Sequence, residues 1–365
     1  MSEPTEANRP GEAASTEKQA RPRWADWRVW LGIGITVACF WYVADGVPLD
    51  EVMAAFGRAD LWTLLVLSVP AHVLSIYLRA LRWRHLTNPI VPMTRGTLYK
   101  AQSIGFLVNN LVPLRMGEIV RAWYLGRETG TRGAAILGTV VLERVLDIVC
   151  VLLMAGASVA VLGSGAGDGI LAQGAMMLLP VAFVPLAGLM ALRFAPDLVI
   201  GIVEFLVRPL PDRLSGFLVA NLRRFTEGLG ALSGGTHLVW IFVHSVLIWG
   251  VVGTLPVTAG LMAFDIEVES FSRLLLVSWL LLAAIGAAVA IPSAPGFFGV
   301  YQLAFVAVLT PIGVDKATCL ALGLLVWFVF WCSFTFQGLI VLRVGGISFA
   351  ELAAASSKDP STNSR

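Results

Sequence analysis

The sequence predicts an all-α, polytopic transmembrane helical bundle, and three observations lead to this fold class. Hydrophobic residues make up 57% of the 365-residue chain and charged residues 14%, whereas soluble domains carry roughly 45–50% and about 25%. The mean hydropathy is +0.79. The apolar residues gather into runs of about 20, the length that crosses a bilayer as a helix. We expect about eight such segments, one or two of them broken or re-entrant.

The elements are expected in the following order. Residues 1–28 mix charged residues with Pro, Ser and Thr and are predicted to be a disordered cytoplasmic tail. A transmembrane domain is expected over 29–343, followed by a second cytoplasmic tail, 344–365. Its candidate spans are 29–47, 61–81, 134–162, 169–194, 237–263, 271–291 and 318–342. Residues 195–236 alternate apolar and basic residues and are predicted to lie at the cytoplasmic interface as short amphipathic pieces.

Two apolar segments do not fit a simple span. Residues 97–112 are short and end in NNLVP, and residues 292–313 open on PSAPG, whose prolines and glycine interrupt a helix. Irregular backbone at membrane depth is tolerated only where protein or a water-filled cavity surrounds it. We therefore expect a helix break in each segment. Residues 271–313 are expected either to cross the membrane twice or to re-enter from outside.

The distribution of charge orients the chain, because Lys and Arg accumulate on the cytoplasmic side of membrane proteins. The loop 45–60 carries four acidic residues against Arg58 alone and is predicted to be external. Residues 79–100 and 115–132, on the two sides of segment 97–112, are basic and predicted to be internal. This pattern favours re-entry of that segment from the cytoplasmic face. It also places both termini in the cytoplasm, in a multi-pass protein of the cytoplasmic (inner) membrane.

The two interrupted segments are similar to each other. NNLVPLRMGE (109–118) and IPSAPGFFGVYQ (291–302) each place a proline and then a glycine before a carboxylate or carboxamide. Paired Gly/Pro interruptions in corresponding halves of a chain indicate the midplane site of a transporter built as an inverted repeat. Alternatively, glycine and proline are simply common in membrane helices. The sequence alone leaves both interpretations open.

The first break gathers polar residues that suit an anionic lipid headgroup. Arg115, Glu118 and Arg121 are spaced three apart, so they share one helical face. A guanidinium group suits phosphate and stays charged, so Arg115 and Arg121 are predicted to bind phosphate. Asn109 and Asn110 are predicted to hydrogen-bond the same headgroup. The alternative is ordinary positive-inside anchoring of arginines at a helix end.

Segment 134–162 contains the charges Glu143, Arg144 and Asp147. Each costs on the order of 3 kcal/mol at a bilayer centre. The spacings i,i+3 and i,i+4 let one helical face hold a small acid–base cluster. This cluster is predicted either to neutralise itself and lock two helices together, or to polarise or gate a headgroup cavity.

The second break is expected to complete the predicted substrate-binding site. Its members are Pro295, Gly296, Gly299 and Gln302. By the charge distribution, this break enters the membrane from the face opposite to the first break. The two breaks together therefore predict a hydrated pocket between apolar helices.

Other polar residues have ordinary interpretations. Arg79, Arg82 and Trp83 stand in YLRALRWRHL at an internal helix end, where snorkelling arginines and an interfacial tryptophan are expected. His72 and His244 each stand alone in an apolar run and are expected to be packed or hydrogen-bonded.

Several chemistries are not expected. The four cysteines form no CxxC pair and no His–Cys cluster, so we expect no disulfide framework, metal site or cofactor. GxSxG, HExxH, P-loop and nucleotide-binding GxGxxG motifs do not occur, so an enzyme is not expected. The net charge is +2 without a basic run interleaved with aromatics, so nucleic acid is not an expected partner.

Three strings carry a resemblance to a known family: NNLVPLRMGEIVRAWYLGR, VVLERVLDI and IPSAPGFFGVYQLA. The chain resembles the lysylphosphatidylglycerol synthase transmembrane region, a family of flippase-like membrane domains, over most of residues 29–343. In its best-known members this domain precedes an aminoacyl-transfer domain and moves the modified lipid between leaflets. The resemblance implies a stand-alone member that lacks the transfer domain. Related sequences often carry Glu where this chain has Gln302, which puts a proton-coupled role of this position in doubt.

The expected function is translocation of an anionic or phosphate-bearing lipid between leaflets, or assistance to it. One alternative is an integral-membrane lipid or glycan transferase, with Glu118 or Asp147 as its catalytic carboxylate. Another is a non-transporting scaffold of an envelope-lipid synthesis complex. The expected partners are membrane lipids and a separate lipid-modifying or glycosyltransferase enzyme.

Overall fold

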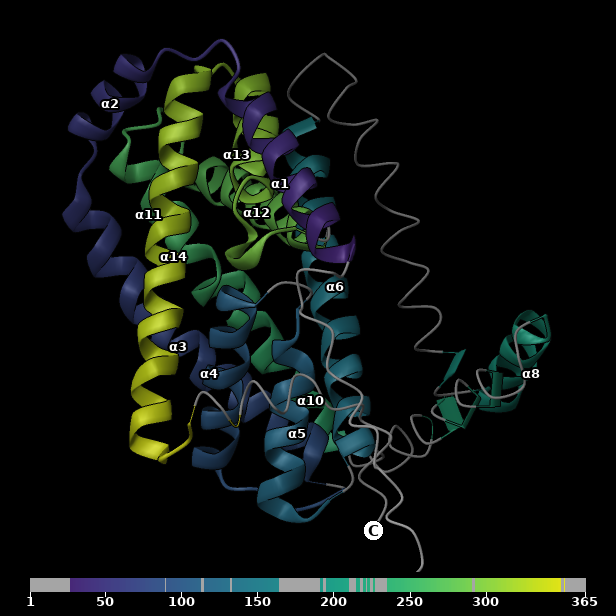
Figure 1. Cartoon of the computed structure of the whole chain (residues 1–365). Coiled ribbons are helices and arrows are strands. Elements are labelled where there is room, and N and C mark those ends of the chain that lie inside the picture. The colour runs from purple at the N-terminus through teal and green to yellow at the C-terminus, as the bar shows by residue number, and fades with distance from the viewer. Residues whose placement is uncertain are drawn as a thin grey trace, which may run out of the picture.

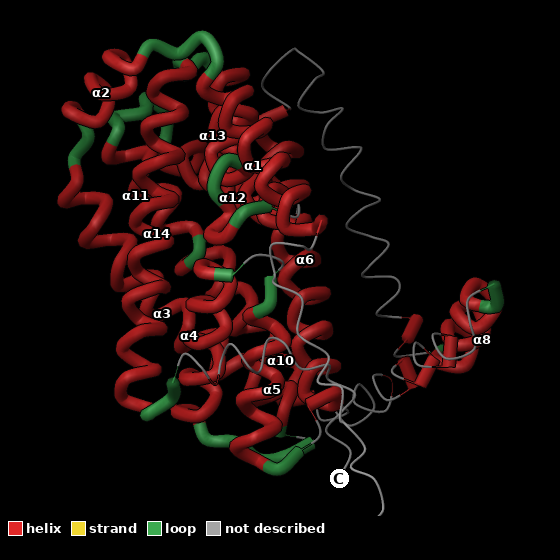
Figure 2. Tube along the Cα trace, in the orientation of Figure 1, coloured by secondary structure: helices red, strands yellow, loops and turns green. Residues whose placement is uncertain are grey.

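The computed structural model describes most of the apolar domain. The described residues are 27–88, 90–112, 115–131, 133–163, 191–192, 195–209, 215–216, 219–220, 222–223, 226, 235–290, 293–348 and 351. Every regular element in these ranges is a helix (Figure 2). The all-α polytopic bundle predicted from the sequence is confirmed. The expected span 169–194, much of 195–236 and most of both tails lie outside the described residues.

Long apolar helices form the frame of the bundle (Figure 1). They are α3 (Leu61–Thr87), α6 (Gly133–Gly163), α14 (Lys316–Gly345), and a rod in which α10 (Gly235–Val246) continues through the π-helix η2 (Leu247–Val252) into α11 (Thr254–Ala263). Each has the length and hydropathy to cross a membrane. Carboxylates cap two of them: Asp60 accepts from the amides of Trp62 and Thr63, and Asp315 accepts from the amide of Thr318. Hydrogen bonds from Thr63 hold the pKa of the Asp60 carboxyl below its ordinary value.

The two ends of the bundle are defined by short helices. At one end, α1 (Trp27–Ala44) bends by 83° into α2 (Leu49–Arg58). The Asp60 amide, which follows α2, donates to the carbonyl of Ala263 at the end of α11. The Lys316 amino group at the start of α14 donates to the carbonyls of Tyr42 and Asp45 after α1. We call this end of the bundle the α2 end. The opposite end, at which α3 and α14 finish, is called the α5 end.

The first break is the turn of a helical hairpin that enters from the α5 end. Helix α4 (Arg95–Leu111) and helix α5 (Gly117–Thr129) run antiparallel. They touch at Gly105 and Gly117, where a Cβ built on Gly117 would lie 1.9 Å from the Gly105 carbonyl oxygen. The missing side chains therefore allow backbone-to-backbone packing. Helix α4 does not meet the length and hydropathy criteria of a span, which agrees with a re-entrant segment.

The second break is the turn of a hairpin that enters from the α2 end. It consists of α12 (Phe271–Ala290), the 3₁₀ turn η3 (Pro295–Phe297), α13 (Val300–Leu309) and the 3₁₀ turn η4 (Thr310–Ile312). The indole nitrogen of Trp327 on α14 donates to the Gly296 carbonyl. Trp327 lies about 16 Å along α14 from Lys316, at a rise of 1.5 Å per residue, whereas the whole helix of 30 residues is about 45 Å long. The turn is therefore well inside the bundle, and the pair α12–α13 is re-entrant rather than a double crossing.

The order of elements occurs twice in opposite directions. Helix α3 runs toward the α5 end, the hairpin α4–α5 enters there, and α6 returns. The rod α10–η2–α11 runs toward the α2 end, the hairpin α12–α13 enters there, and α14 returns (Figure 1). This arrangement agrees with the inverted repeat that the paired Pro-Gly strings indicate. Helix α8 (Pro196–Val207) belongs to the predicted amphipathic loop.

Candidate functional site

The charges of α6 lie inside the bundle, in contact with α3 and α5. Glu143 is fully buried. One of its carboxylate oxygens lies 2.9 Å from Arg121 Nη1 on α5, and the other accepts from Arg82 Nη2 on α3 at 3.2 Å. The amide nitrogen of Gln102 on α4 also donates to Glu143 at 3.2 Å, while its oxygen accepts from Arg121 at 2.7 Å. Four helices therefore converge on one carboxylate.

Asp147 lies one helical turn further along α6 and is engaged even more completely. It accepts from Arg82 Nη2 at 2.7 Å and from Arg79 Nη1 at 3.3 Å. The indole nitrogen of Trp249, in the π-helix η2, donates to it at 2.8 Å. Arg144 Nη2 lies 3.5 Å from its second oxygen. A π-helix inserts an extra residue into a turn and often marks a functional site, and here it brings the indole of Trp249 to the carboxylate.

We call Arg79, Arg82, Gln102, Arg121, Glu143 and Asp147 the buried ion cluster. Aromatic rings cover two of its guanidinium groups. Arg121 lies 4.8 Å from the ring centroid of Trp83, and Arg79 lies 5.1 Å from that of Trp249. Cation–π contacts of this kind stabilise cations away from water. Removing one partner of such a desolvated pair is costly, whereas the intact pair adds little net stability.

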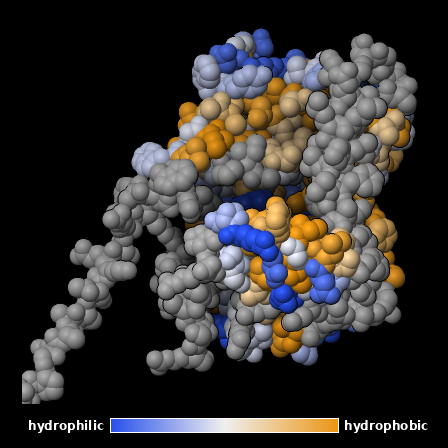
Figure 3. Space-filling view, turned by 90° about the vertical axis from the view of Figure 1, so that its right-hand side faces the viewer, coloured by the Kyte–Doolittle hydropathy of each residue, from blue (hydrophilic) through white to orange (hydrophobic). Residues whose placement is uncertain are grey.

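A partly exposed set of charges adjoins the cluster, and we call Arg115, Glu118 and Arg144 the polar rim. Arg144 Nε lies 3.7 Å from Glu118 Oε1, and these side chains are 32% and 23% exposed. The Arg115 guanidinium lies 5.7 Å from the ring of Phe297 in the second break. Figure 3 shows hydrophilic atoms at mid-height on the face turned toward the viewer, with apolar atoms above and below them. The rim therefore offers cationic groups that are less buried than those of the cluster.

Backbone geometry and side-chain hydrogen bonds fix the conformation of the first break. Arg115 adopts a positive φ of 54°, a conformation that costs energy for a residue with a side chain. The Asn109 side-chain oxygen accepts from the Gly117 amide at 2.9 Å, which joins the end of α4 to the start of α5. The Asn110 side-chain nitrogen donates to the Trp331 carbonyl and to the Thr335 hydroxyl of α14, both at 3.2 Å. The two asparagines therefore hold the turn in place.

The second break uses glycines where the first uses asparagines. Gly296 and Gly299 have φ values of 73° and 83°, which residues with a Cβ rarely adopt. Gln302 is buried, and its side-chain oxygen accepts from the Gly299 amide at 2.7 Å. Pro295 is exposed and opens the 3₁₀ turn. Like the asparagines, these residues shape a turn, while Asn110 Oδ1 and Gln302 Nε2 are buried without a hydrogen-bond partner.

The two breaks meet at Trp331, midway along α14. The Trp331 indole nitrogen donates to the Asn110 carbonyl of the first break at 3.4 Å. A Cβ built on Gly296 of the second break would lie 2.8 Å from a carbon of the same indole and 3.6 Å from the Asn110 carbonyl oxygen. The structure thus brings together the two Pro-Gly strings, which the sequence separates by about 180 residues, and the helices are interrupted at both.

Among the positions predicted as site residues, a subset remains accessible. Arg115, Glu118 and Arg144 form the rim, whereas Arg121, Glu143 and Asp147 are buried in the cluster. The cluster joins helices, as the first interpretation of the α6 charges expects. The rim is partly exposed, as the second interpretation, a role in a headgroup cavity, requires.

The interpretation of Arg79, Arg82 and Trp83 as snorkelling or interfacial side chains is wrong. Arg82 and Trp83 are fully buried, Arg79 is 8% exposed, and the arginines face Asp147. The Trp83 indole donates to the Thr139 hydroxyl of α6 at 2.8 Å. Basic residues near a helix end resemble anchors in a sequence, and only the packing of α3 against α6 reveals their partners. Spacing offers one missed signal, because Arg79 and Arg82 at i,i+3 match the spacing of Arg144 and Asp147.

The charges of the cluster and rim do not balance. Five arginines stand against three carboxylates in this group. Several guanidinium nitrogens have no hydrogen-bond partner, among them Nε and Nη2 of Arg121 and Nε of Arg115. Excess positive charge with unused donors suits a phosphate or carboxylate, which accepts charge-assisted hydrogen bonds. Within the described ranges, no group of three or more His, Cys, Asp or Glu side chains is arranged to hold a metal ion.

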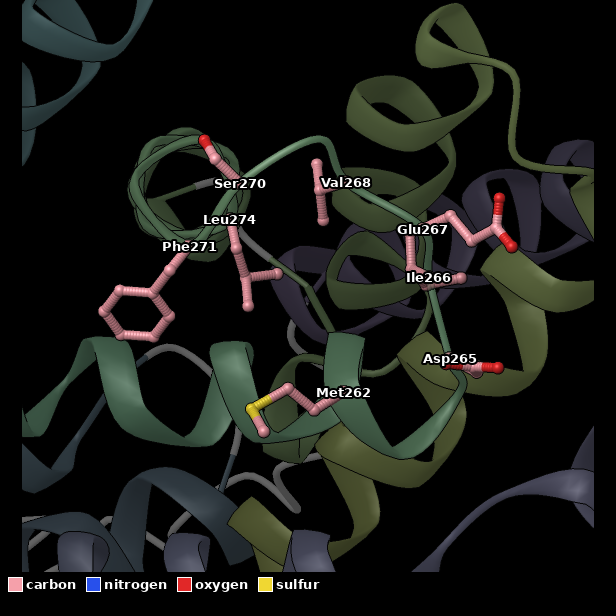
Figure 4. A pocket seen from close by; sticks show the side chains of 8 residues that line it. All are labelled: Met262, Asp265, Ile266, Glu267, Val268, Ser270, Phe271 and Leu274. Carbon is pink, nitrogen blue, oxygen red and sulfur yellow. The ribbon is translucent and has the colours of Figure 1, made fainter.

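A separate surface pocket of about 370 Å³ lies at the α2 end, far from these charges. It follows the loop between α11 and α12 (Figure 4). Met262 and Phe271 lie on one side of it, and the carboxylates of Asp265 and Glu267 point to the other. No arginine or lysine lines this pocket. It therefore does not share the chemistry of the rim.

Long apolar helices, two re-entrant hairpins and charges gathered beside the turn of the first hairpin define a multi-pass α-helical membrane protein with an internal polar site. The family model described as Lysylphosphatidylglycerol synthase TM region matches residues 29–338, and the chain belongs to this family. No curated protein and no solved structure matches the chain.

Proposed function

We propose that this protein translocates an anionic or phosphate-bearing lipid between the leaflets of the cytoplasmic membrane, or assists its translocation. The observation that carries the proposal is the meeting of two re-entrant turns beside the polar rim of Arg115, Glu118 and Arg144. Membership of a family whose name refers to a lipid synthase supports a role in lipid handling.

The headgroup would bind at the rim while its acyl chains stay in the bilayer. Arg115 and Arg144 would contact the phosphate, and Glu118 would orient Arg144 or accept a hydrogen bond from the headgroup. The buried ion cluster would supply a net positive charge behind the rim, because Arg79, Arg82 and Arg121 stand there against two carboxylates. The hairpins would move in turn to open the rim toward one leaflet or the other.

The charges at the two ends support an orientation with both termini in the cytoplasm. The α2 end carries acidic residues such as Asp50 and Glu51, and the α5 end carries Arg95, Lys100 and Arg127. Positive residues accumulate on the cytoplasmic side. The expected partners are membrane lipids and a separate lipid-modifying or glycosyltransferase enzyme that supplies or uses the lipid.

The test is reconstitution in liposomes that contain a fluorescent anionic lipid, with Arg115→Gln as the variant. Translocation should fall at least about tenfold, because the loss of a charge-assisted phosphate contact of about 1.5–3 kcal/mol corresponds to one or two decades. Arg127→Gln is the matched control, since Arg127 pairs with Glu351 on the surface and should transport normally. Full activity of Arg115→Gln would show that Arg115 is not part of the lipid-binding site.

One observation favours a second function, that of an integral-membrane transferase. Glu118 is partly exposed, and among the described residues one arginine, Arg144, lies within ion-pair distance of it, which leaves this carboxylate freer to act than Asp147, held by three arginines and Trp249. Thin-layer chromatography of the same liposomes separates the two functions. A chemically altered lipid that disappears in Glu118→Gln would support the transferase, and scrambling of an unaltered lipid would support transport. If neither occurs, the scaffold role in an envelope-lipid synthesis complex is favoured.

A further inference from the structure

Three of the four histidines of the chain meet near the α5 end of the bundle. His85 lies in the last turn of α3, and His237 and His244 lie on α10, about 150 residues later. The ring of His85 lies 5.3 Å from that of His237 and 5.6 Å from that of His244, measured between centroids. His244 is packed and hydrogen-bonded, as expected from the sequence, and the packing of α10 on α3 also gives it an imidazole neighbour.

The hydrogen bonds of the three rings constrain which ring nitrogens carry a proton. His244 Nδ1 lies 2.6 Å from the Trp240 carbonyl oxygen, so this nitrogen carries the proton and donates. His85 Nδ1 and His237 Nδ1 face each other at 3.1 Å. Two such nitrogens form a hydrogen bond only when one is protonated and the other is not. One further proton can enter the Nε2 atom of the donor ring and leave this bond intact, whereas protonation of both rings removes the acceptor and places two imidazolium groups side by side.

The charged groups near the three histidines are cationic or already paired. Helix α10 packs against α3 and α6 and continues into η2. On α3 the charged neighbours are arginines, with Arg84 beside His85. The first turns of α6, GAAILGTVVL, carry no titratable residue, and Glu143 and Asp147 beyond them are engaged by arginines. The residues of η2, LIWGVV, are uncharged, and α10 has no titratable residue besides His237 and His244.

The same helix reaches the buried ion cluster. Ser245, next to His244, accepts from Arg82 Nη1 at 3.1 Å. Trp249, one turn further in the π-helix, donates to Asp147. The contact of α10 with α3 at the histidines therefore fixes the position of two residues that hold the arginine and the carboxylate of the cluster.

We propose that His85, His237 and His244 form a proton-sensitive latch that holds α10 against α3 and, through Ser245 and Trp249, holds the buried ion cluster closed. With one neutral ring donating to the other, the latch is shut. Acid adds protons to imidazole rings. Once both facing rings are protonated, their positive charges beside Arg84 repel one another and α10 separates from α3. Acidification at the α5 end thus loosens the cluster.

The latch itself is tested by a distance, without any transport assay. Spin labels are placed at Ile90→Cys, after α3, and at Val239→Cys, on the exposed face of α10, in full-length protein whose four native cysteines are replaced by alanine. The labelled protein that keeps its three latch histidines should give one short label-to-label distance at about pH 8 and a longer or broader distance distribution at about pH 5. His85→Asn keeps a neutral hydrogen-bonding group near the Nδ1 position and should keep the short distance at both pH values.

His72→Gln is the control, because His72 lies apart from the latch, between Phe330 and Phe334, and its replacement should leave the pH response intact. An unchanged distance in the wild type, or a pH response that persists in His85→Asn, would overturn the latch. Its consequence for lipid movement rests on the proposed function and is measured separately, as the pH dependence of scrambling in liposomes. Absence of scrambling at every pH would refute the proposed function and leave the latch standing. Scrambling without a pH-dependent change in the distance would refute the latch and leave the proposed function standing.

Discussion

The two breaks have the same architecture and opposite chemistry. Each is the turn of a helical hairpin that ends beside Trp331 of α14. The first break is lined by charges, with Arg115 and Glu118 next to the arginines and carboxylates of the cluster. The second is formed by glycines and aromatic rings, with Phe298 stacked on Phe40 and edge-on to Trp327.

The difference shows two ways to satisfy an irregular backbone away from water. At the first break, the Asn109 side chain accepts from the freed Gly117 amide, and the Trp331 indole donates to the freed Asn110 carbonyl. At the second, glycine permits the turn, and the Trp327 indole bonds the Gly296 carbonyl. Because only the first break brings charge, an anionic headgroup would be held from one side and bounded by aromatic rings on the other.

The largest expected effect comes from removing the carboxylate that the charged break depends on. Glu143→Ala removes the carboxylate partner of Arg121 and one of the two carboxylates that pair with Arg82, and it should lower the free energy of unfolding by about 3–5 kcal/mol. Gln302→Ala, in the second break, removes one neutral hydrogen bond to the Gly299 amide and should cost about 1–2 kcal/mol. Thermal unfolding in detergent measures both. Equal losses would contradict the asymmetry between the breaks.

A smaller effect is expected from a single methyl group in the first hairpin. In Gly117→Ala the added Cβ meets the Gly105 carbonyl oxygen, so α4 and α5 must separate, at about 1–3 kcal/mol. Gly138→Ala, in α6, is the matched control, because a Cβ there meets nothing within 4 Å. That variant should be neutral or gain up to about 1 kcal/mol of helix propensity. A normal melting temperature for Gly117→Ala would mean that the hairpin is not closely packed.

The smallest effect is expected where the two breaks are joined. Trp331→Phe keeps an aromatic ring beside Gly296 and removes only the hydrogen bond to the Asn110 carbonyl, which should cost about 1 kcal/mol. If the bond links the two hairpins, faster hydrogen exchange should appear at both breaks. Exchange confined to α4 and α5 would show that the hairpins open independently.

Much of the fold could be predicted from the sequence, because the bilayer imposes length and polarity on each segment. The interrupted segments at Pro113 and Pro295 were identifiable by proline, glycine and charge, and basic flanks indicated re-entry of the first. Whether 271–313 crosses twice could not be predicted, since α12 and α13 have the length and hydropathy of spans. Only the contact of Gly296 with Trp327, deep in the bundle, decides it.

The candidate site was predictable in part for a different reason. Charges inside an apolar run, such as Glu143 and Asp147, are conspicuous because they are expensive. Their partners Arg79 and Arg82 were missed, since arginines near a helix end are common and a sequence does not show which helix they face. Gln102 and Trp249 carry no charge, and only the π-helix brings the indole of Trp249 to Asp147.

The most direct test of the central claim is a cryo-electron microscopy structure of the protein in a nanodisc of anionic lipids. The account predicts a lipid phosphate in hydrogen-bond contact with Arg115 or Arg144, midway along α14, with its chains passing outward between the hairpins. Phosphates found only at the two ends of the helices, with the rim closed and empty of lipid, would contradict it.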